Sequence, residues 1–260
     1  MTKNYLFDVL RDGFQYLTIP RSGRYRFEVI GASCSYYSPG ARIIGELGLE
    51  KGEKITVALG QRGSNWTSGN GGTFVVKENG TSDPQVLFVS GGAGFAYVNE
   101  DFNTASLSQI ASGNDKIGTS GVQKLYADDD HHIFCGGAGF LDGPVTDELR
   151  IDSIAPKIYK EGLVGGFGID DDGDVTEGGF GGGGAYYLEK FNGHEYYGAG
   201  GGYTGGGTEI YPDAPEDAPA DASAYGKCDG GGGGSFSFDK EAKFDHVHEE
   251  YGKCIVTYLD

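Results

Sequence analysis

The stretch that decides the fold of this chain is GGFGGGG at residues 178–184, followed by GGGYTGGG at residues 200–207. Glycine lacks a Cβ atom and loses more conformational freedom on folding than any other residue. Segments this rich in glycine are ordinarily flexible linkers, which favour serine as the second residue. These two runs instead enclose an aromatic residue, Phe180 in the first and Tyr203 in the second. We therefore expect the runs to form ordered structure.

Similar runs recur through the second part of the chain. The sequence GGAGF stands at residues 91–95 and again at residues 136–140, and two further clusters lie at residues 165–168 and 230–234. Their uneven spacing excludes a regular solenoid. Extended helices of three residues per turn have no internal hydrogen bonds, so their backbone groups must pair between helices, and glycine permits that close approach. We predict a packed bundle of polyglycine-II-type helices.

The first 90 residues indicate antiparallel β-structure. Residues 24–29 alternate charged and apolar side chains, which is typical of a half-buried strand. Strand signals return at the C-terminus, in residues 235–238 and 254–259, so the last strand is expected to rejoin the sheet of residues 1–90. The strands expected in the first part are 14–19, 24–29, 43–49, 54–59, 73–76 and 86–90.

These patterns predict a mainly β chain that forms one compact unit. Residues 1–90 are expected to form a jelly-roll-like antiparallel β-sandwich, because many short strands alternate with turn signals. Residues 91–234 are expected to form the inserted glycine-helix bundle, and residues 235–260 the closing strands of the sandwich. No uncharged apolar stretch approaches ~18 residues, so no transmembrane helix is expected.

The charge of the chain is uneven. It holds 20 basic and 38 acidic residues, for a formal net charge of -18. Residues 1–90 contribute +2 (10 basic, 8 acidic) and residues 91–260 contribute -20 (10 basic, 30 acidic). Nucleic-acid binding is disfavoured because phosphates are recognised by a basic face. A basic protein or peptide is the natural partner of so acidic a chain; the oligomeric state is not indicated.

The sequence gives no support for catalysis or for a cofactor. Residues 179–184 and 200–205 match GxGxxG, but neither follows a strand and opens a helix, as dinucleotide binding requires. No nucleophile stands in a recognisable signature, and no pair of carboxylates is singled out for glycoside hydrolysis. We expect no enzyme activity, with a hydrolase kept as a third alternative because acidic residues are abundant.

Asp170, Asp172 and Asp174 are weak candidates for a calcium site, because hard carboxylate oxygens suit that ion. The EF-hand frame fails, since Gly168 falls at its first ligand position. A solvated acidic turn is the favoured interpretation, so no metal is predicted.

A second metal hypothesis concerns zinc. His246, His248 and Glu250 alternate, so in a strand they would share one face, and imidazoles with a carboxylate can bind zinc. Residues 128–132 (DDDHH) form another possible metal loop. Exposed strand and loop residues are the favoured interpretation of both.

The residues alone do not decide the cellular compartment. The even cysteine count permits two disulfides in three connectivities, and the absence of a CxxC pair disfavours structural zinc. Two N-glycosylation sequons begin at Asn65 and Asn79. The alternatives are buried thiols and chance sequons, and the opening residues do not form a signal-peptide core. An extracellular or cell-surface setting is favoured, with the cytoplasm as the alternative. The four cysteines are Cys34, Cys135, Cys228 and Cys254, of which Cys228 and Cys254, flanking the last glycine run and final strand, are the expected pair.

The order of these motifs resembles the glycine-rich extracellular module of the anaplastic lymphoma kinase and leukocyte tyrosine kinase receptors. The resemblance covers about residue 5 to residue 260, and rests on FQYLTIPRSGRYRFEVIG (14–31), VLFVSGGAG (86–94), the two central glycine runs and GGGGGSFSF (230–238). It implies a tumour-necrosis-factor-like sandwich that carries a rigid glycine-helix bundle. It also implies binding of small, basic cytokine ligands.

The resemblance also implies where the ligand binds. Tyr203 and the acids that follow it fall where these receptors meet their basic ligands, so Tyr203 and Glu209 are the main candidates. An aromatic anchor beside carboxylates also suits an Arg- or Lys-bearing partner. The further candidates are Asp213, Glu216 and Asp217.

The chain departs from these receptors in one respect that bears on function. No kinase motif is present, so tyrosine kinase activity cannot reside in it. The expected function is a non-catalytic binding module that presents an acidic face to a basic protein ligand. The alternative is a stand-alone glycine-rich structural or adhesion protein.

Overall fold

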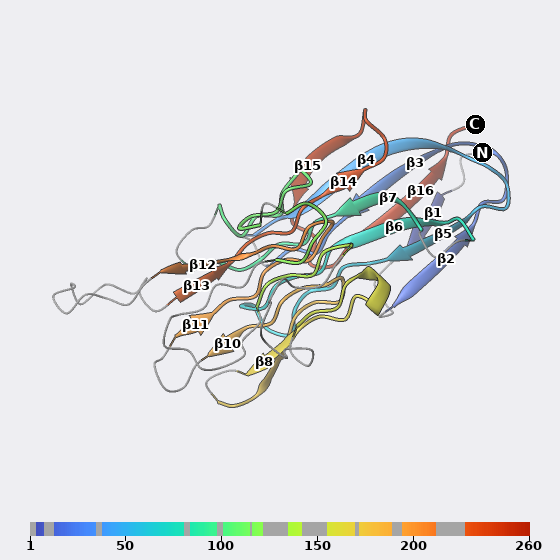
Figure 1. Cartoon of the computed structure of the whole chain (residues 1–260). Helices are drawn as coiled ribbons and strands as arrows, with labels where there is room; N and C mark the ends of the chain where they lie inside the picture. Colours follow the sequence, from blue (N-terminus) through green and yellow to red (C-terminus); the bar gives the residue numbers. More distant parts are fainter. Residues whose placement is uncertain are drawn as a thin grey trace.

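The structure is a computed structural model that describes residues 4–7, 13–34, 38–80, 84–97, 101–114, 116–121, 135–141, 155–169, 172–188, 194–211 and 227–260. Within these ranges the single helix is a 3-10 turn, η1 (Tyr159–Glu161). No helix in the described part is long and apolar enough to span a membrane. Almost all regular structure is strand (Figure 1), so the prediction of a mainly β chain is confirmed.

Two five-stranded antiparallel sheets form the half of the molecule that carries both chain ends (Figure 1). The last strand, β16 (Lys253–Tyr258), pairs with β3 (Gly23–Ile30), which confirms the predicted return of the C-terminus. The first sheet has the order β1 (Asn4–Phe7), β16, β3, β4 (Gly40–Leu49), β15 (Lys243–Val247). The second has the order β14 (Phe236–Ser237), β7 (Gln85–Ser90), β6 (Thr73–Glu78), β5 (Lys54–Ala58), β2 (Phe14–Thr18).

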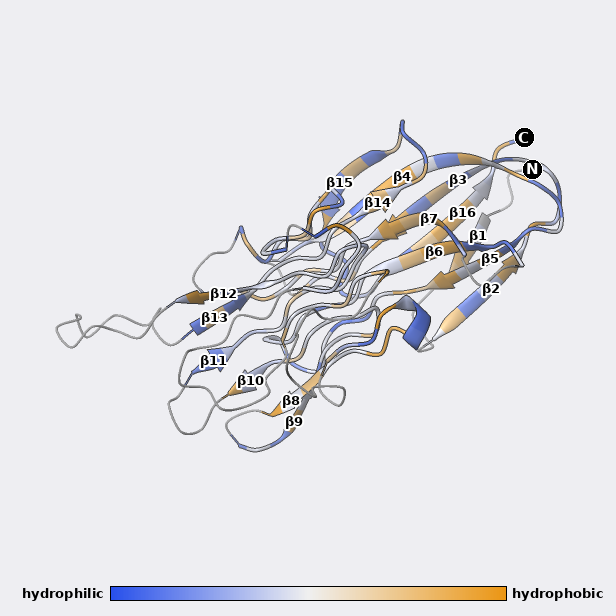
Figure 2. Cartoon of the chain, viewed as in Figure 1, coloured by the Kyte–Doolittle hydropathy of each residue, from blue (hydrophilic) through white to orange (hydrophobic). Residues whose placement is uncertain are grey.

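The two sheets pack face to face around one hydrophobic core. Along β3 the side chains of Tyr25, Phe27 and Val29 point inward and are fully buried, whereas the residues between them are polar. This alternation follows from the period of two of a strand, and Figure 2 shows it as alternating colours along the sandwich strands. The opposite sheet contributes Ile55 and Val57 to the same core. Burial of each such side chain contributes about 1.5–3 kcal/mol.

The second sheet is buried on both faces. In β6, Val75 points into the sandwich core, whereas Phe74 and Val76 belong to a separate cluster on the outer face. That outer cluster includes Phe140 and Leu163, which come from the glycine-rich part. A strand buried on both sides reads as a continuous apolar run, and this is why TFVV at residues 73–76 does not alternate.

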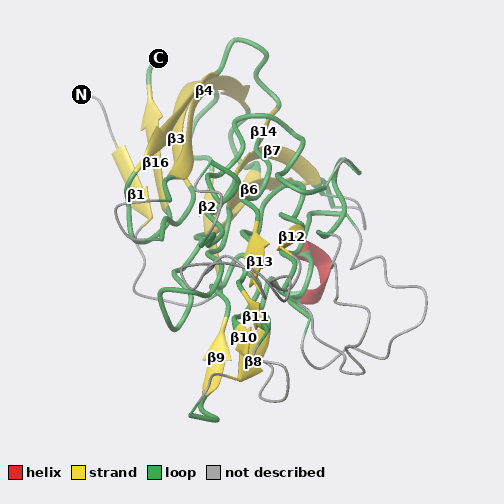
Figure 3. Cartoon of the chain, turned by 90° about the vertical axis from the view of Figure 1, so that its left-hand side faces the viewer, coloured by secondary structure: helices red, strands yellow, loops and turns green. Residues whose placement is uncertain are grey.

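The glycine runs pair with one another through their backbones. Successive residues of the run at 198–203 donate their N–H groups to three neighbouring segments in rotation, over 2.8 to 3.2 Å. A residue of the run and the residue three positions after it donate to the same neighbouring segment. Figure 3 shows that most of this region is neither helix nor strand. The donors and acceptors are Gly198 to Thr67, Ala199 to Cys135, Gly200 to Gly231, Gly201 to Asn70, Gly202 to Ala138, and Tyr203 to Gly234.

The close packing of these runs requires glycine. A Cβ atom built on Gly201 would lie 2.1 Å from the carbonyl oxygen of Gly181, and one on Gly121 would lie 1.8 Å from that of Gly206. Gly181 and Gly182 also adopt positive φ angles of 101° and 83°, which side chains disfavour. The glycines therefore allow neighbouring backbones to pack closely, and they do not act as flexible linkers here.

Short strands form at the end of the molecule farthest from the termini (Figure 1). None of them is among the strands expected from the sequence. We call the four-stranded sheet the distal sheet; its order is β10 (Tyr187–Leu188), β11 (Glu195–Tyr196), β13 (Lys227–Gly230), β12 (Thr208–Tyr211). Beside it lies the hairpin of β8 (Phe167–Ile169) and β9 (Val175–Glu177).

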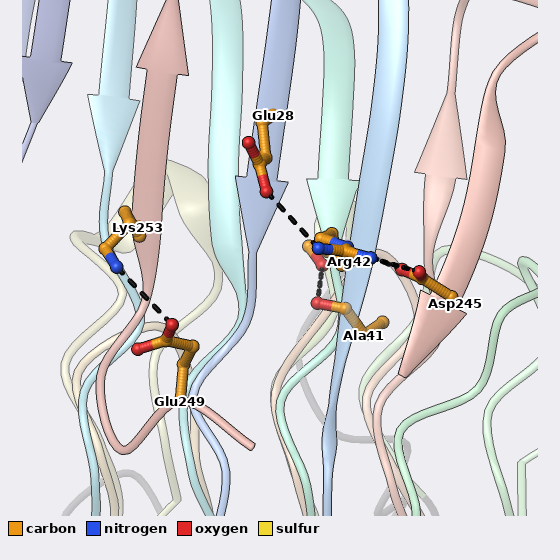
Figure 4. Close-up of polar contacts among 7 residues, drawn as sticks. Glu28, Ala41, Arg42, Asp245, Glu249 and Lys253 are labelled. Atoms are coloured by element: carbon orange, nitrogen blue, oxygen red, sulfur yellow. Dashed lines mark hydrogen bonds and ion pairs between the residues drawn. The ribbon is translucent and has the colours of Figure 1, made fainter. Parts of the chain in front are cut away.

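One ion-pair network crosses the outer surface of the first sheet. Arg42 of β4 donates from Nε to Asp245 Oδ1 of β15 over 2.7 Å, and its Nη1 lies 3.5 Å from Glu28 Oε1 of β3 (Figure 4). A separate pair joins Lys253 Nζ to Glu249 Oε1 over 3.4 Å. Arg42 thereby connects the edge strand β15 to two strands inside the sheet.

We expect this network to make stability depend on pH. The hydrogen bond from Arg42, followed by the charge of Arg42, holds the pKa of Asp245 below its usual value. The stabilisation is therefore present above the unfolded pKa of about 3.9 and is lost as the pH falls through the lower folded pKa. Because Asp245 is half exposed, Asp245→Asn should lower the free energy of unfolding at neutral pH by less than ~1 kcal/mol.

Urea unfolding of both proteins between about pH 6 and pH 2 measures this effect. The difference between wild type and Asp245→Asn should shrink as the pH falls. Glu241→Gln, on the exposed turn before β15, is the control. A difference for Asp245→Asn that stays constant across this range contradicts the prediction.

Candidate functional site

The distal sheet has two chemically different faces. In the antiparallel pair β12 and β13, Glu209 stands opposite Asp229 and Tyr211 opposite Lys227, and in the parallel pair β11 and β13, Glu195 stands opposite Lys227. Side chains of directly paired residues lie on the same face of a sheet, as do residues two apart. One face therefore carries the acidic side chains. The opposite face carries the residues that alternate with them along each strand.

The second face is apolar and anchors the sheet. Tyr196 and Cys228 are completely buried there with Cys135, and Tyr187 and Ile210 pack against them. Burial, and to a smaller extent the neighbouring Cys228, raises the pKa of the Cys135 thiol well above its usual value. This face fixes the distal sheet on the segment that contains Cys135.

All four cysteines are buried thiols, so the predicted disulfides are absent. The expected pairing of Cys228 with Cys254 is wrong because the two residues belong to different cores. Cys254 lies on β16 opposite Val29, inside the sandwich, whereas Cys228 lies under the distal sheet. Burial raises the pKa of the Cys254 thiol.

A lysine already occupies part of the acidic face. The Lys227 ammonium pairs with the carboxylate of Glu195 and lies 4.9 Å from the ring centroid of Tyr97 and 6.0 Å from that of Tyr197. The Tyr197 hydroxyl donates to the same carboxylate. Burial, and then this hydrogen bond, raises the pKa of Tyr197, so the hydroxyl keeps its proton. Carboxylate and aromatic rings together form the surroundings that a cation prefers.

The rest of this face is acidic. The Tyr97 backbone N–H donates to Asp229 Oδ1 over 2.7 Å, and the Tyr211 hydroxyl lies 3.4 Å from Glu209 Oε2. Asp229 is completely buried, so the accessible charges of the face are the carboxylates of Glu195 and Glu209 and the ammonium of Lys227, a net charge of -1 (-2 and +1). We define the distal acidic face as Tyr97, Glu195, Tyr197, Glu209, Tyr211, Lys227 and Asp229.

An aromatic row extends this face. Tyr97 stacks on Tyr197 with ring centroids 6.3 Å apart, and Phe95 meets Tyr197 edge-on at 4.9 Å. Trp66 meets Phe95 edge-on at 5.2 Å. Tyr97 and Trp66 are both exposed, at the two ends of the row. Exposed tyrosine and tryptophan rings are enriched at protein-binding surfaces.

The structure separates the two main candidates from the sequence. Glu209 lies on the distal acidic face, in β12. Tyr203 lies instead in the cluster between the glycine-rich part and the second sheet, where its ring stacks between Phe140 at 6.1 Å and Phe236 at 4.6 Å. Asp213, Glu216 and Asp217 lie outside the described residues.

Sequence reasoning missed Glu195, Tyr197, Lys227 and Asp229. HEYY (194–197) and KCDG (227–230) carry little signal, because three residues of each stretch are buried and only Glu195 and Lys227 are partly exposed. Strands of two to four residues are also too short for a period of two to be recognised without the pairing between them.

The described residues contain no group of three His, Cys, Asp or Glu side chains that could hold a metal ion. Asp172 and Asp174 lie on the exposed turn between β8 and β9, and Asp170 lies outside the described part, as do residues 128–132. Of the zinc candidates, His246 Nε2 bonds to the Ala105 carbonyl over 2.8 Å, and Glu250 pairs with Arg62 over 2.7 Å.

The two sequon asparagines have different surroundings. Asn65 is half-buried, and its Oδ1 accepts bonds from the backbone N–H of Ser68 over 2.9 Å and from the Ser68 hydroxyl over 2.7 Å. Asn79 is exposed just after β6. Asn79 is therefore the more accessible of the two acceptors.

The distal acidic face brings carboxylates and tyrosine rings together. Carboxylates beside tyrosine rings attract an ammonium or a guanidinium group, and Lys227 shows how such a group is accommodated. Comparison of the chain with protein-family models and with curated proteins gives no match.

Proposed function

We propose that this chain is a non-catalytic binding module that captures a basic protein or peptide on the distal acidic face. The observation that supports the proposal is the position of Lys227, whose ammonium lies between the carboxylate of Glu195 and the ring of Tyr97. Within the described residues, the carboxylate of Glu209 on the same face has a single partner, the neutral hydroxyl of Tyr211. We expect a cationic group of the ligand to bind beside this carboxylate.

We infer that the sandwich is jelly-roll-like and that the glycine runs are polyglycine-II-type helices. The hydrogen bonds of residues 198–203 support the helices, because they return to the same neighbour every third residue and such helices have three residues per turn. Helices tied to several neighbours form a rigid base. Rigid display reduces the entropy lost on binding, and the acidic charge of the chain raises the rate of encounter with a basic partner.

The proposal includes an extracellular or cell-surface setting, as in the receptor modules that the sequence resembles. Exposed Asn79 is compatible with it. The four buried thiols favour a reducing compartment instead, which is the cytoplasmic alternative. The alternative function is a stand-alone glycine-rich structural or adhesion protein. Dependence of binding on salt distinguishes the two functions, since ions screen contacts between charges more than contacts between aromatic rings.

We expect the chain to bind a fluorescein-labelled octa-arginine peptide and not octa-glutamate. Fluorescence polarisation should show the affinity for octa-arginine falling at least about tenfold between ~0.05 M and ~0.3 M salt. Glu209→Gln should raise the Kd about two- to fivefold, because it removes a charge from the face without changing its shape.

Glu161→Gln is the matched control, because Glu161 is exposed on η1 and the variant has the same net charge as Glu209→Gln. Equal effects of the two variants would mean that the peptide responds only to total charge, which contradicts the proposed site. Binding of octa-arginine that is insensitive to salt would favour the adhesion alternative.

A further inference from the structure

A cleft of about 370 Å³ lies where the sandwich meets the hairpin of β8 and β9. One side is the segment that follows β5, with Gln61, Arg62 and Ser64. The other side comes from the glycine runs that flank the hairpin, with Val164, Phe167, Glu177 and Phe180. No residue of the distal acidic face lines this cleft, so it is a separate site.

The apolar wall of the cleft is open to solvent. Val164 is 58% exposed and Phe167 is 43% exposed, an unusual degree for large apolar side chains that line one concave surface. Phe167 stands directly opposite Glu177 in the hairpin, so both side chains leave the same face. Phe180 is held by an edge-on contact with Phe14, whose ring centroid lies 6.2 Å away.

The polar rim is acidic. The backbone of Glu177 is fixed by two bonds to Ser64, one to its hydroxyl over 2.7 Å and one from its N–H over 2.8 Å. In the described part of the chain the Glu177 carboxylate has no ion-pair or hydrogen-bond partner, whereas Arg62 is paired with Glu250 over 2.7 Å. The charged residues that line the cleft are Arg62 and Glu177, and because Glu250 outside the cleft neutralises Arg62, the charge left open is that of Glu177. The open carboxylate therefore selects a cationic group.

The floor of the cleft is rigid glycine backbone. The Gly178 N–H donates to the Gly166 carbonyl over 2.8 Å, and a Cβ atom on Gly165 would lie 1.9 Å from the Gly178 oxygen. The volume is at the low end of the range of about 300–1,000 Å³ for ligand pockets. It therefore suits one or two residues of a peptide rather than a large cofactor.

We propose that this cleft binds an apolar side chain of a peptide ligand whose neighbouring residue is basic. The apolar side chain rests on Val164, Phe167 and Phe180, and the basic group meets the carboxylate of Glu177. The fixed floor lets the ligand bind without reorganisation of the protein. This proposal does not depend on the function assigned to the distal acidic face.

The probes that test it are four capped dipeptide amides: acetyl-Leu-Arg, acetyl-Leu-Asp, acetyl-Ala-Arg and acetyl-Ala-Asp. They are titrated into the isotope-labelled full chain, and backbone amide shifts are followed by NMR. We expect acetyl-Leu-Arg to shift the amides of residues 164–167 and 177–180 and to bind about tenfold more tightly than acetyl-Leu-Asp or acetyl-Ala-Arg. Equal affinity for all four probes, or shifts confined to other residues, would overturn the proposal.

The variants separate the cleft from its surroundings. Phe167→Ser should weaken acetyl-Leu-Arg about tenfold, and Ile169→Ser is the matched control, because Ile169 is 42% exposed on the same strand but does not line the cleft. Glu177→Gln should remove the preference for acetyl-Leu-Arg over acetyl-Leu-Asp. Binding at the cleft is read from the amides of residues 164–167 and 177–180, so a failure of this proposal is distinguishable from a failure of the distal acidic face, where arginine would shift other amides. An equal loss in Phe167→Ser and Ile169→Ser contradicts the assignment.

Discussion

Gly200→Ala is expected to destabilise the chain by about 3 kcal/mol or more. The added Cβ atom would lie 2.0 Å from the carbonyl oxygen of Gly92 and 2.9 Å from the amide nitrogen of Gly233. Both neighbours are backbone atoms held by their own hydrogen bonds, so neither can move as a side chain would. Overpacking typically costs about 1–3 kcal/mol, and more where nothing can relax. In a chain of this size the melting temperature should fall by about 6–12 °C.

Thermal unfolding followed by circular dichroism measures this loss. Gly48→Ala is the matched control, because a Cβ atom on Gly48 meets open space and the residue lies within the strand β4. That substitution should be neutral or stabilising by up to ~1 kcal/mol, since alanine loses less entropy than glycine on folding. Similar melting temperatures for the two variants would show that the runs are not closely packed.

Phe74→Ala is expected to cost about 3–5 kcal/mol, the usual range for the loss of a buried phenylalanine. Phe74 is completely buried on the outer face of the second sheet, with ring centroids 6.4 Å from Phe140 and 6.0 Å from Tyr159. The substitution would leave a cavity between the sandwich and the glycine-rich part. If the two parts are one cooperative unit, the whole chain should lose stability in a single transition.

Two signals make this a test of cooperativity. Trp66, the single tryptophan, lies beside Phe95 in the glycine-rich part, so its fluorescence reports on that part. Circular dichroism reports mainly on the strands of the sandwich. In urea the two signals should give the same midpoint in the wild type and in Phe74→Ala. Tyr16→Ala is the control, because Tyr16 is exposed on β2 of the same sheet and should change stability by no more than ~0.5 kcal/mol. Separate midpoints in the wild type would contradict a single unit.

The long strands could be predicted from the sequence because each carries its own signal. Residues 24–29 alternate, and β3 forms over Gly23–Ile30 with the alternate side chains buried. The return of the C-terminus was likewise readable, from the strand pattern at residues 254–259 that forms β16. The strands β1 and β15 were missed. Lys243–Val247 has a weak pattern, and its position at the sheet edge is fixed by pairing with β4.

The candidate site was predicted only in part. The sequence singled out Glu209, which lies on the distal acidic face, but it joined Glu209 to Tyr203, whose ring packs between Phe140 and Phe236 against the second sheet. Lys227 contacts Tyr97 and Glu195, which lie about 100 residues apart in the sequence. No local pattern connects them, because the parallel pairing of β11 and β13 joins segments that are distant in the sequence.

The sequence by itself determined that the chain is mainly β, that its last strand rejoins the first sheet, and that its glycine runs are structural. Each of these follows from local properties: the period of side chains along a strand and the absence of a Cβ atom in glycine. Tertiary structure alone decided which residues meet at the distal acidic face and in the cleft, and it left all four cysteines as thiols, with Cys254 in the sandwich core and Cys135 beside Cys228 under the distal sheet. These outcomes depend on how distant backbones pair, and glycine runs of nearly identical sequence carry little information about which neighbour each one takes.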